Sequence, residues 1–170
     1  NAFTGKGERS RYLIEIFKVH NNNIEKLIGK DYAKPTLTKY TTTLNHLENF
    51  LKWKYKTSDI NLSQLKYEFL ADFEFYLKTE KSIEHNTTAK YIKNTKKVVN
   101  DCLAKGWLKA NPFANFKIAT KLVDRNFLSE SELDILANKE LKVERIAIVR
   151  DIFVFSCYTG LSYIDVANLT

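Results

Sequence analysis

Apolar side chains recur at helical spacing along most of this chain, and that feature constrains the fold more than any other. The clearest seam consists of Leu37, Tyr40, Leu44, Leu47 and Leu51. Spacings of three and four residues place these side chains on one face of an α-helix, which we expect from Pro35, a favourable first-turn residue, to about Lys56. Only five glycines and two prolines occur in 170 residues, so few positions interrupt helices. The sequence therefore predicts an all-α fold.

Three further helices are expected in the first part of the chain. One covers about residues 9–28 and is ended by Gly29, although the run Asn21-Asn22-Asn23 competes for backbone hydrogen bonds within it. Another runs from residue 63 or 66 to residue 80. The last runs to residue 105, with Asn86 as its N-cap and Gly106 after its end. Together they predict a four-helix bundle over residues 1–109.

The helical pattern is interrupted at Asn111-Pro112-Phe113 and returns at Ser129. We expect residues 110–128 to be a linker. Ser129 and Glu132 have the spacing of a capping box and predict a short helix to about residue 138. A helix over residues 143–158 follows and is apolar on nearly all sides, so it requires neighbours all around it. Residues 129–170 are expected to form the beginning of a second helical domain.

Charge is unevenly distributed between the two parts. Residues 1–122 contain 22 lysines and arginines against 12 acidic residues, whereas residues 123–170 have a net charge of −3. A basic first part predicts a polyanionic partner. The longest apolar run, Ile152 to Phe155, is far too short to span a bilayer, and no secretory or lipidation signal is present. We therefore expect a cytoplasmic protein that binds nucleic acid rather than a membrane.

No pattern typical of a metal site or a catalytic triad occurs. Cys102 and Cys157 lie in apolar helical contexts without a further Cys or His at metal-ligand spacing, and we expect both to be buried and reduced. His20, His46 and His85 are dispersed, and no glycine-rich phosphate loop is found. The sequence predicts neither a cofactor nor a metal, and no small-molecule substrate.

One face of the helix at residues 86–105 is rich in lysine. Its stripe consists of Asn86, Lys90, Lys93 and Lys97, flanked by Thr87, Asn94 and Lys96. Between His85 and Gly106 only Asp101 is acidic, whereas a face that is merely solvated usually alternates its charges. Such a stripe can lie along a DNA groove and bind phosphates, and an ordinary solvated surface is the alternative.

The helix at residues 35–56 offers a second polar surface. It comprises Thr36, Lys39, Thr43 and His46. Threonine and histidine can hydrogen-bond phosphates or base edges, so these four residues are also candidates for DNA binding. Alternatively, Thr36 only stabilises the start of the helix, and His46 is only exposed to solvent.

Several segments, in this order, resemble the tyrosine recombinases of the phage-integrase family, and above all the integrases of mobile elements. Five segments resemble the SAM-like core-binding domain of these enzymes: Pro35–Tyr40, Leu44–Leu51, Phe69–Leu77, Asn86–Asn94 and Gly106–Phe113. The segment Phe127–Leu133 resembles the first helix of their catalytic domain, and Thr159-Gly160-Leu161 resembles their first active-site box. The resemblance implies a DNA-binding domain over residues 1–109 and an N-terminal fragment of a catalytic domain over residues 129–170.

The resemblance also implies a chemistry. In this family a tyrosine attacks a scissile phosphate, a 3′-phosphotyrosyl intermediate forms, and a freed 5′-hydroxyl then attacks the partner strand. The partners implied are double-stranded DNA and further copies of the full-length enzyme assembled on it. The family's tyrosine lies far downstream, so neither Tyr158 nor Tyr163 is expected to be the nucleophile. We expect a fragment that binds DNA but does not cleave it.

The predicted active-site box departs from the family at one position. The first catalytic arginine usually follows Thr-Gly-Leu, and here that position is Ser162, which offers one hydroxyl donor instead of a cationic fork. Asp165 lies where the family has an acidic residue that orders the active site, with helix capping as the alternative. Two other functions stay open: a non-catalytic helical DNA-binding regulator, and a protein-interaction module whose basic face docks on an acidic partner.

Overall fold

Helices make up the regular secondary structure of residues 10–169, the part of the chain that this computed structural model describes. The only strand-like pairings among these residues are two isolated β-bridges. The predicted all-α fold is therefore confirmed. The chain divides into two compact units, Asn1–Leu122 and Val123–Thr170.

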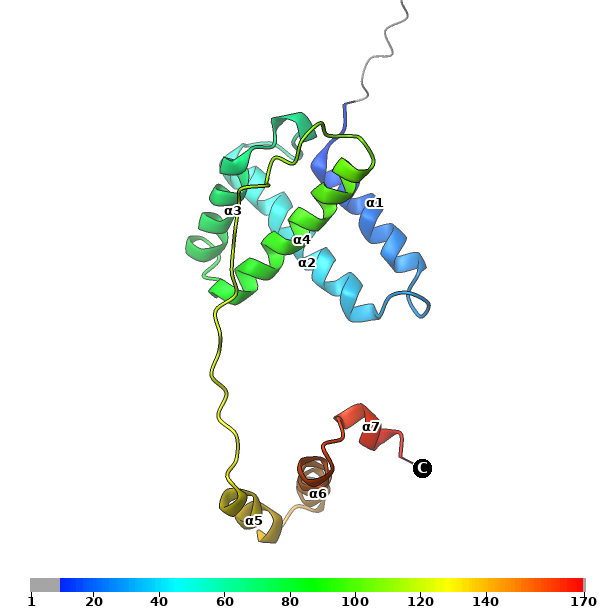
Figure 1. Cartoon of the computed structure of the whole chain (residues 1–170), viewed down its shortest axis with the longest axis vertical. Coiled ribbons are helices and arrows are strands. Elements are labelled where there is room, and N and C mark those ends of the chain that lie inside the picture. The colour runs from blue at the N-terminus through cyan, green and yellow to red at the C-terminus, as the bar shows by residue number, and fades with distance from the viewer. Residues whose placement is uncertain (1–9, 170) are drawn as a thin grey trace, which may run out of the picture. The chain divides into compact units, whose positions relative to one another are not determined.

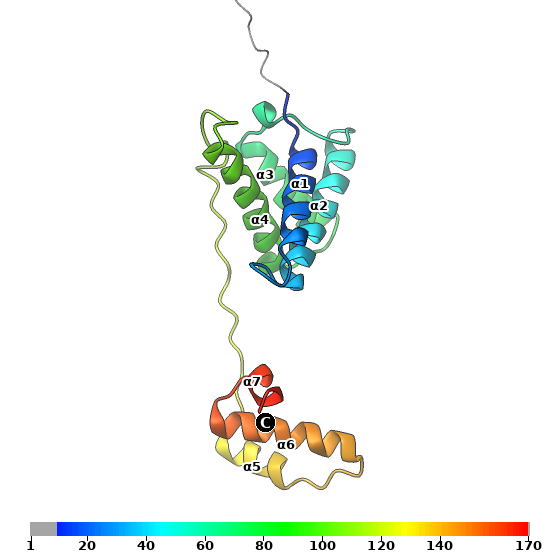
Figure 2. The ribbon, with the colours of Figure 1, turned by 90° about the vertical axis from the view of Figure 1, so that its right-hand side faces the viewer.

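The first unit is a bundle of four long helices. They are α1 (Leu13–Lys26), α2 (Lys34–Lys54), α3 (Tyr67–Thr79) and α4 (His85–Ala104), with a short 3₁₀ turn, η1 (Leu62–Gln64), before α3. Helix α1 packs on α2, and α3 packs on α4. Helices α2 and α4 also contact each other and cross near the middle of the bundle (Figure 1), and Figure 2 shows α1 beside α2. This crossing brings together the two helices on which the sequence placed the candidate DNA-binding residues.

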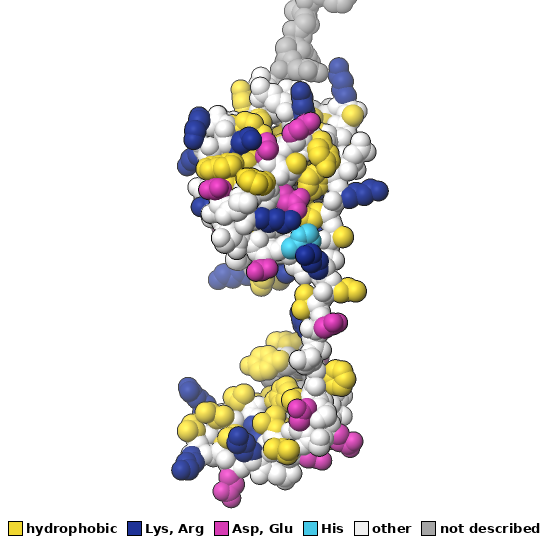
Figure 3. All heavy atoms as spheres, turned by 90° about the vertical axis from the view of Figure 1, so that its left-hand side faces the viewer, with side chains coloured by type: hydrophobic (Ala, Val, Ile, Leu, Met, Phe, Trp, Pro, Cys, Tyr) yellow, Lys and Arg dark blue, Asp and Glu magenta, His cyan; other side chains and the backbone are white. Residues whose placement is uncertain are grey.

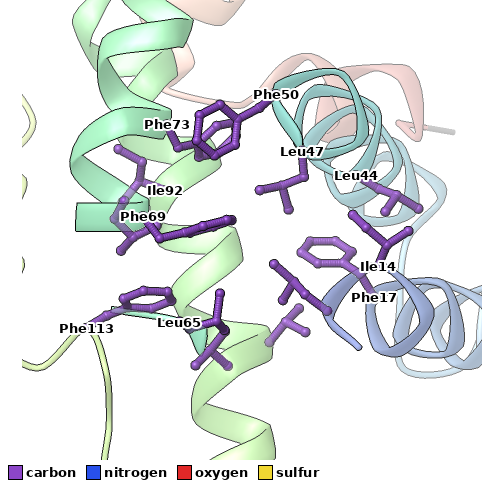
Figure 4. Close-up of a cluster of buried hydrophobic side chains, with 14 of the residues drawn as sticks. Ile14, Phe17, Leu44, Leu47, Phe50, Leu65, Phe69, Phe73, Ile92 and Phe113 are labelled. Carbon is purple, nitrogen blue, oxygen red and sulfur yellow. The ribbon is translucent and has the colours of Figure 1, made fainter. Parts of the chain in front are cut away.

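Aromatic side chains form the centre of the bundle core. The ring of Phe50 lies 5.3 Å from Phe69, 5.2 Å from Phe73 and 5.6 Å from Tyr76, measured between centroids (Figure 4). All four side chains are buried. Tilted and edge-on pairs at these distances add about 0.5–1.5 kcal/mol each to the burial of apolar area. The core therefore holds α2 and α3 together tightly.

Two predicted helix starts differ from the structure. Helix α1 begins at Leu13. Its N-terminus is capped by Asp59, whose carboxylate accepts hydrogen bonds from the N–H groups of Ile14 (2.8 Å) and Glu15 (3.1 Å). Helix α4 begins at His85, so the prediction of Asn86 as its N-cap is wrong. The start of α1 thus depends on a residue far away in the sequence, which local spacing does not reveal.

The segment after α4 packs on the bundle. We call residues 111–121 the strap. Its aromatic side chains Phe113 and Phe116 are 0% and 3% exposed and belong to the core. The Asn111 side chain accepts a hydrogen bond from the Phe113 N–H (2.8 Å) and donates one to Asn100 of α4 (2.8 Å). In the structure, most of the segment predicted as a linker from residue 110 therefore belongs to the first unit.

The second unit contains three helices. They are α5 (Glu130–Asn138), α6 (Glu144–Thr159) and α7 (Tyr163–Ala167). The predicted capping box is confirmed, because Ser129 and Glu132 exchange hydrogen bonds at the start of α5. Gly160 ends α6 with a φ of +71°, a conformation that favours glycine.

None of these three helices has a buried residue. Apolar side chains such as Ile148, Phe153 and Phe155 stand at the surface of the second unit, which carries many hydrophobic side chains in Figure 3. Cys102 of α4 is buried as predicted, but the prediction that Cys157 is buried is wrong. Cys157 is exposed because α6 has too few neighbours to cover it.

Candidate nucleic-acid interface

Helix α4 has two chemically different faces. Its core face is formed by apolar side chains and threonines, among them Ala89, Ile92 and Val99, all fully buried. Lys90, Lys93 and Lys97 are exposed on the other side. The 3.6-residue period of the helix therefore separates the lysines from the core, as the sequence predicted.

A groove of about 460 Å³ lies between α2 and α4, and we call it the lysine groove. It is lined by Lys39, Thr42, Thr87, Lys90, Tyr91, Lys93 and Asn94. Five of these residues are candidates predicted from the sequence, one from α2 and four from α4. The helix crossing thus brings two polar surfaces that are about 50 residues apart in the sequence into one concave site.

The lysines of this groove, like most lysines of the bundle, have no carboxylate partner in the described part of the chain, whereas four other bundle lysines do. Lys39, Lys90 and Lys93 take part in no ion pair among the described residues. Elsewhere, Lys18 pairs with Glu48, Lys54 with Asp72 and Lys78 with Glu74. The face seen in Figure 3 likewise interleaves basic and acidic side chains. The positive charge of the lysine groove is therefore not neutralised by the protein itself.

Thr43, one of the predicted DNA-binding residues, lies inside the bundle and does not line the lysine groove. Its side chain is 0% exposed. The Thr43 hydroxyl donates to the Lys39 carbonyl (2.7 Å) and accepts from the Asn94 side-chain amide (2.9 Å). Thr43 thus connects α2 to α4 inside the bundle. Asn94 still lines the lysine groove, but one of its amide hydrogens is used in this connection.

His46 is half-buried rather than simply exposed. Its ring lies 4.8 Å from that of Tyr91, and its Nδ1 atom is buried without a hydrogen-bond partner. Burial lowers the pKa of His46, and the nearby charge of Lys81 lowers it further. The lowered pKa favours the neutral imidazole, which carries no positive charge for a phosphate. Its role in the structure is to pack between α2 and α4.

Asn86 and His85 are engaged with the strap. The Asn86 amide accepts a hydrogen bond from the Lys121 N–H (2.8 Å) and donates one to the Lys121 carbonyl (3.0 Å). The His85 Nε2 atom lies 2.8 Å from the Ala119 carbonyl oxygen. The Asn86 side chain, which was predicted to bind DNA, is therefore occupied by the backbone of the protein.

Thr36 and Lys97 lie beside a different hollow. This space of about 620 Å³ is bordered by α1, α2 and α4, and His20 and Tyr40 also line it. The Lys97 ammonium lies 2.8 Å from the carboxylate of Asp101, whose hydrogen bond and charge raise the pKa of Lys97. Thr36 therefore does not line the lysine groove, although Lys39 lines both spaces, and the charge of Lys97 is partly balanced.

A third hollow contains a lysine that the sequence did not identify. It has a volume of about 470 Å³ and lies between α4 and the strap. Lys93, Lys96 and Lys97 line it on the side of α4, and Lys117 lines it on the side of the strap. Lys117 was overlooked because it falls in the predicted linker. The sequence feature that could have indicated this packing is the pair Phe113 and Phe116. Two aromatic residues three positions apart indicate a segment that packs on a core.

The two predicted active-site residues of the second unit interact with each other. The Ser162 hydroxyl donates to the Asp165 carboxylate (2.6 Å), which also accepts from the Ser162 N–H (3.2 Å). This arrangement caps the start of α7. The Tyr158 hydroxyl donates to Asp134 (3.3 Å), and the negative charge of Asp134 raises the pKa of Tyr158. A raised pKa disfavours the phenolate, so this environment does not activate Tyr158 as a nucleophile.

Residues 10–169 contain neither a metal-binding cluster nor a helix able to span a membrane. Within that range, no three His, Cys, Asp or Glu side chains come together in a way that could hold a metal ion. None of the helices described there combines the length and the apolar character needed to cross a bilayer.

Comparison with known proteins gives one significant result. No curated protein and no solved structure matches the chain. A family model described as "Phage integrase SAM-like domain" matches residues 12–118. The match covers α1 to α4 and most of the strap, which is more than half of the chain and includes the lysine groove. The chain therefore belongs to the family of phage integrase SAM-like domains.

Proposed function

We propose that the four-helix bundle binds double-stranded DNA through the lysine groove. One observation carries the proposal: Lys39, Lys90 and Lys93 come from two helices, line one groove, and have no carboxylate partner among the described residues. The net charge of +10 over residues 1–122 supports it, because it draws the whole unit toward a polyanion.

The dimensions of α4 fit a phosphate backbone. Lys90 and Lys97 are separated by about 10 Å along the helix axis, at 1.5 Å per residue. Each strand of B-DNA has one phosphate per about 3.4 Å of axis. Successive lysines on this face can thus contact different phosphates, and Thr87 and Asn94 can add hydrogen bonds. Such contacts favour duplex DNA of any sequence, because they engage the backbone rather than the bases.

We further propose that this binding serves DNA strand exchange by a site-specific tyrosine recombinase that integrates or excises a mobile element. Family membership supports this proposal, as does the segment Thr159-Gly160-Leu161-Ser162 between α6 and α7. Attack by a tyrosine conserves the phosphoester energy, so strand exchange of this kind needs neither ATP nor a metal. Several copies of the enzyme would assemble on the recombining DNA.

Ser162 would contribute to this chemistry in a limited way. Its hydroxyl donates to Asp165, so it would have to rotate before it could donate to a phosphate. A hydroxyl carries no positive charge, whereas the pentacovalent transition state gains negative charge that cationic donors must balance. Catalysis would therefore depend on cations outside the Ser162–Asp165 pair.

The double substitution Lys90→Glu/Lys93→Glu tests DNA binding. We expect it to weaken binding to duplexes of all sequences alike, because phosphate contacts are lost. We also expect it to reduce the slope of log affinity against log salt concentration by about 2. The measurement is fluorescence anisotropy of a labelled random-sequence duplex at several salt concentrations.

Lys66→Glu/Lys109→Glu is the matched control. It changes the net charge equally, both lysines are exposed, and neither lines the lysine groove. Lys66 directly precedes α3, and Lys109 follows the end of α4. Both of these helix ends lie away from the first turns of α4, where Lys90 is located (Figure 1). We expect this control to retain most of the affinity. Equal losses in both variants, or none in the first, would reject the lysine groove as the DNA-binding surface.

A further inference from the structure

We propose that the strap forms a second wall of the DNA-binding surface, with Lys96 and Lys117 as additional phosphate contacts. His85 and Asn86 act as positioning residues that hold the strap in place. This inference rests on the proposed DNA binding and adds Lys117, which the helix pattern did not identify. It extends the lysine groove across α4 into the hollow between α4 and the strap.

The strap is anchored in the bundle core at its beginning. Phe113 and Phe116 are buried, and the Phe116 ring lies 5.3 Å from that of Tyr67. Burial of two phenylalanines stabilises this position by a few kcal/mol, at about 1.5–3 kcal/mol for each side chain. The burial of Phe116 thus anchors the backbone next to Lys117 to the core.

The later part of the strap is fastened by polar contacts to the first turn of α4. Asn86 makes two hydrogen bonds with the backbone of Lys121, and His85 contacts the Ala119 carbonyl. One amide side chain thereby satisfies both the N–H and the carbonyl of a single residue. With Phe116 anchored in the core and Lys121 held by Asn86, Lys117 is confined to a short segment fixed at both ends.

The hollow between α4 and the strap is strongly basic. Four of its lining residues are lysines, namely Lys93, Lys96, Lys97 and Lys117, and none of its lining residues is acidic. Lys97 is balanced by Asp101, which lies outside the lining. Ammonium groups gathered in one hollow repel each other, and binding of a polyanion relieves this repulsion.

Lys96 is held in an orientation suited to this role. Its ammonium donates to the Phe116 carbonyl at 2.6 Å. An ammonium has three N–H donors, so two remain for a phosphate. Because this contact already restrains the long side chain, less conformational entropy is lost when Lys96 binds an anion.

The two basic hollows adjoin each other at Lys93. Lys93 lines both the lysine groove and the hollow next to the strap. Basic side chains therefore follow each other from Lys39 on α2, across α4, to Lys117 on the strap. A small anion would engage one part of this track, whereas a nucleic-acid backbone has charges at regular intervals along its whole length. This track of basic side chains therefore indicates a DNA strand as its ligand.

The first test is Lys117→Gln in a salt titration with a random-sequence duplex and the whole chain. Loss of one phosphate contact should reduce the salt slope by about 0.9 and the affinity about fivefold near 0.15 M salt. Lys109→Gln removes the same charge from an exposed lysine outside both hollows and should leave the slope unchanged. An unchanged slope for Lys117→Gln overturns the inference.

The second test releases the strap without removing a lysine. His85→Ala/Asn86→Ala should weaken binding, and adding Lys117→Gln to it should cost less than twofold, because Lys117 is then no longer held beside α4. Full additivity in this double-mutant cycle would overturn the positioning role of His85 and Asn86. Circular dichroism in the helical region and thermal melting of each variant check that the bundle remains folded.

The two proposals can fail separately. If Lys90→Glu/Lys93→Glu weakens binding while both strap variants bind like the wild type, DNA binding through the lysine groove stands and the strap inference is rejected. If Lys90→Glu/Lys93→Glu also has no effect, the proposed function itself is rejected.

Discussion

At the scale of single residues, the direction of each polar atom decides whether a predicted DNA contact is available. Lys39 and Thr43 are one helical turn apart on α2, so sequence spacing places them on the same side. Lys39 is exposed and lines the lysine groove, whereas the short side chain of Thr43 bonds the Lys39 carbonyl and Asn94. Threonine hydroxyls often return to the backbone in this way. Spacing alone does not distinguish the two outcomes.

Thr43→Val tests this assignment. We expect the free energy of unfolding to fall by about 1 kcal/mol, because Asn94 loses its acceptor inside the bundle. The salt slope of DNA binding should stay that of the wild type. Urea unfolding and the salt titration provide the two measurements.

Thr42→Val serves as the comparison, since Thr42 lines the lysine groove and bonds only the Thr38 carbonyl at 3.0 Å. It should change stability less than Thr43→Val does. A salt slope lowered by Thr43→Val as strongly as by Lys90→Glu would show that Thr43 contacts DNA after all.

At the scale of elements, helix ends in this bundle are completed by distant residues. Asp59 lies 45 positions after Ile14, yet its carboxylate accepts hydrogen bonds from the first N–H groups of α1. The same carboxylate accepts from the Ile60 N–H at 2.7 Å. Adjacent backbone bonds, Leu13 N–H to the Ile60 carbonyl and Leu62 N–H to the Arg11 carbonyl, hold the two segments together. Helix α1 is therefore tied to the loop before α3.

Asp59→Ala should lower the free energy of unfolding by about 1 kcal/mol, the usual effect of losing a helix cap. Asp59→Asn should have a smaller effect, because the amide keeps one acceptor oxygen. Amide hydrogen exchange at Ile14 and Glu15 should accelerate in Asp59→Ala. Asp31→Ala, at an exposed loop position, should leave both quantities unchanged. If Asp31→Ala and Asp59→Ala are equally destabilised, Asp59 has no special role as a cap.

At the scale of the whole molecule, the two units differ in how they bury apolar side chains. The bundle has a continuous aromatic and aliphatic core, whereas α5, α6 and α7 have no buried residue. Phe153 is 45% exposed and Ile148 is 53% exposed. Apolar surface of this kind binds hydrophobic dyes and favours association.

A chain truncated after Leu122 should retain the cooperative thermal melting of the bundle and lose most of the fluorescence of the dye ANS. Phe153→Ser/Phe155→Ser in the full chain should reduce this fluorescence without changing the melting of the bundle. The measurements are a dye titration and a melt followed by circular dichroism. Fluorescence that persists in the truncated chain would place the dye-binding surface on the bundle instead.

Local patterns predicted the helices of the bundle well. The apolar seam and Pro35 predicted a helix over residues 35–56, close to the observed α2 at Lys34–Lys54. The same patterns gave Asn86 as the N-cap of α4, whereas the helix begins at His85 and the Asn86 side chain pairs with Lys121, 35 positions later. They also treated Lys117 as part of a linker, because a segment without helical period gives no sign of where it packs.

Helical periodicity, together with the segregation of lysines from apolar residues, determined from the sequence alone that this chain is all-α and that α4 has a basic face. These are local properties, set by the order of side chains along a helix. Only the tertiary structure decided that Lys39 joins Lys90 and Lys93 in one groove, that Thr43 is buried, and that Asn86 holds the strap. Each of these depends on contacts between residues that are distant in the sequence and that only the folded chain brings together.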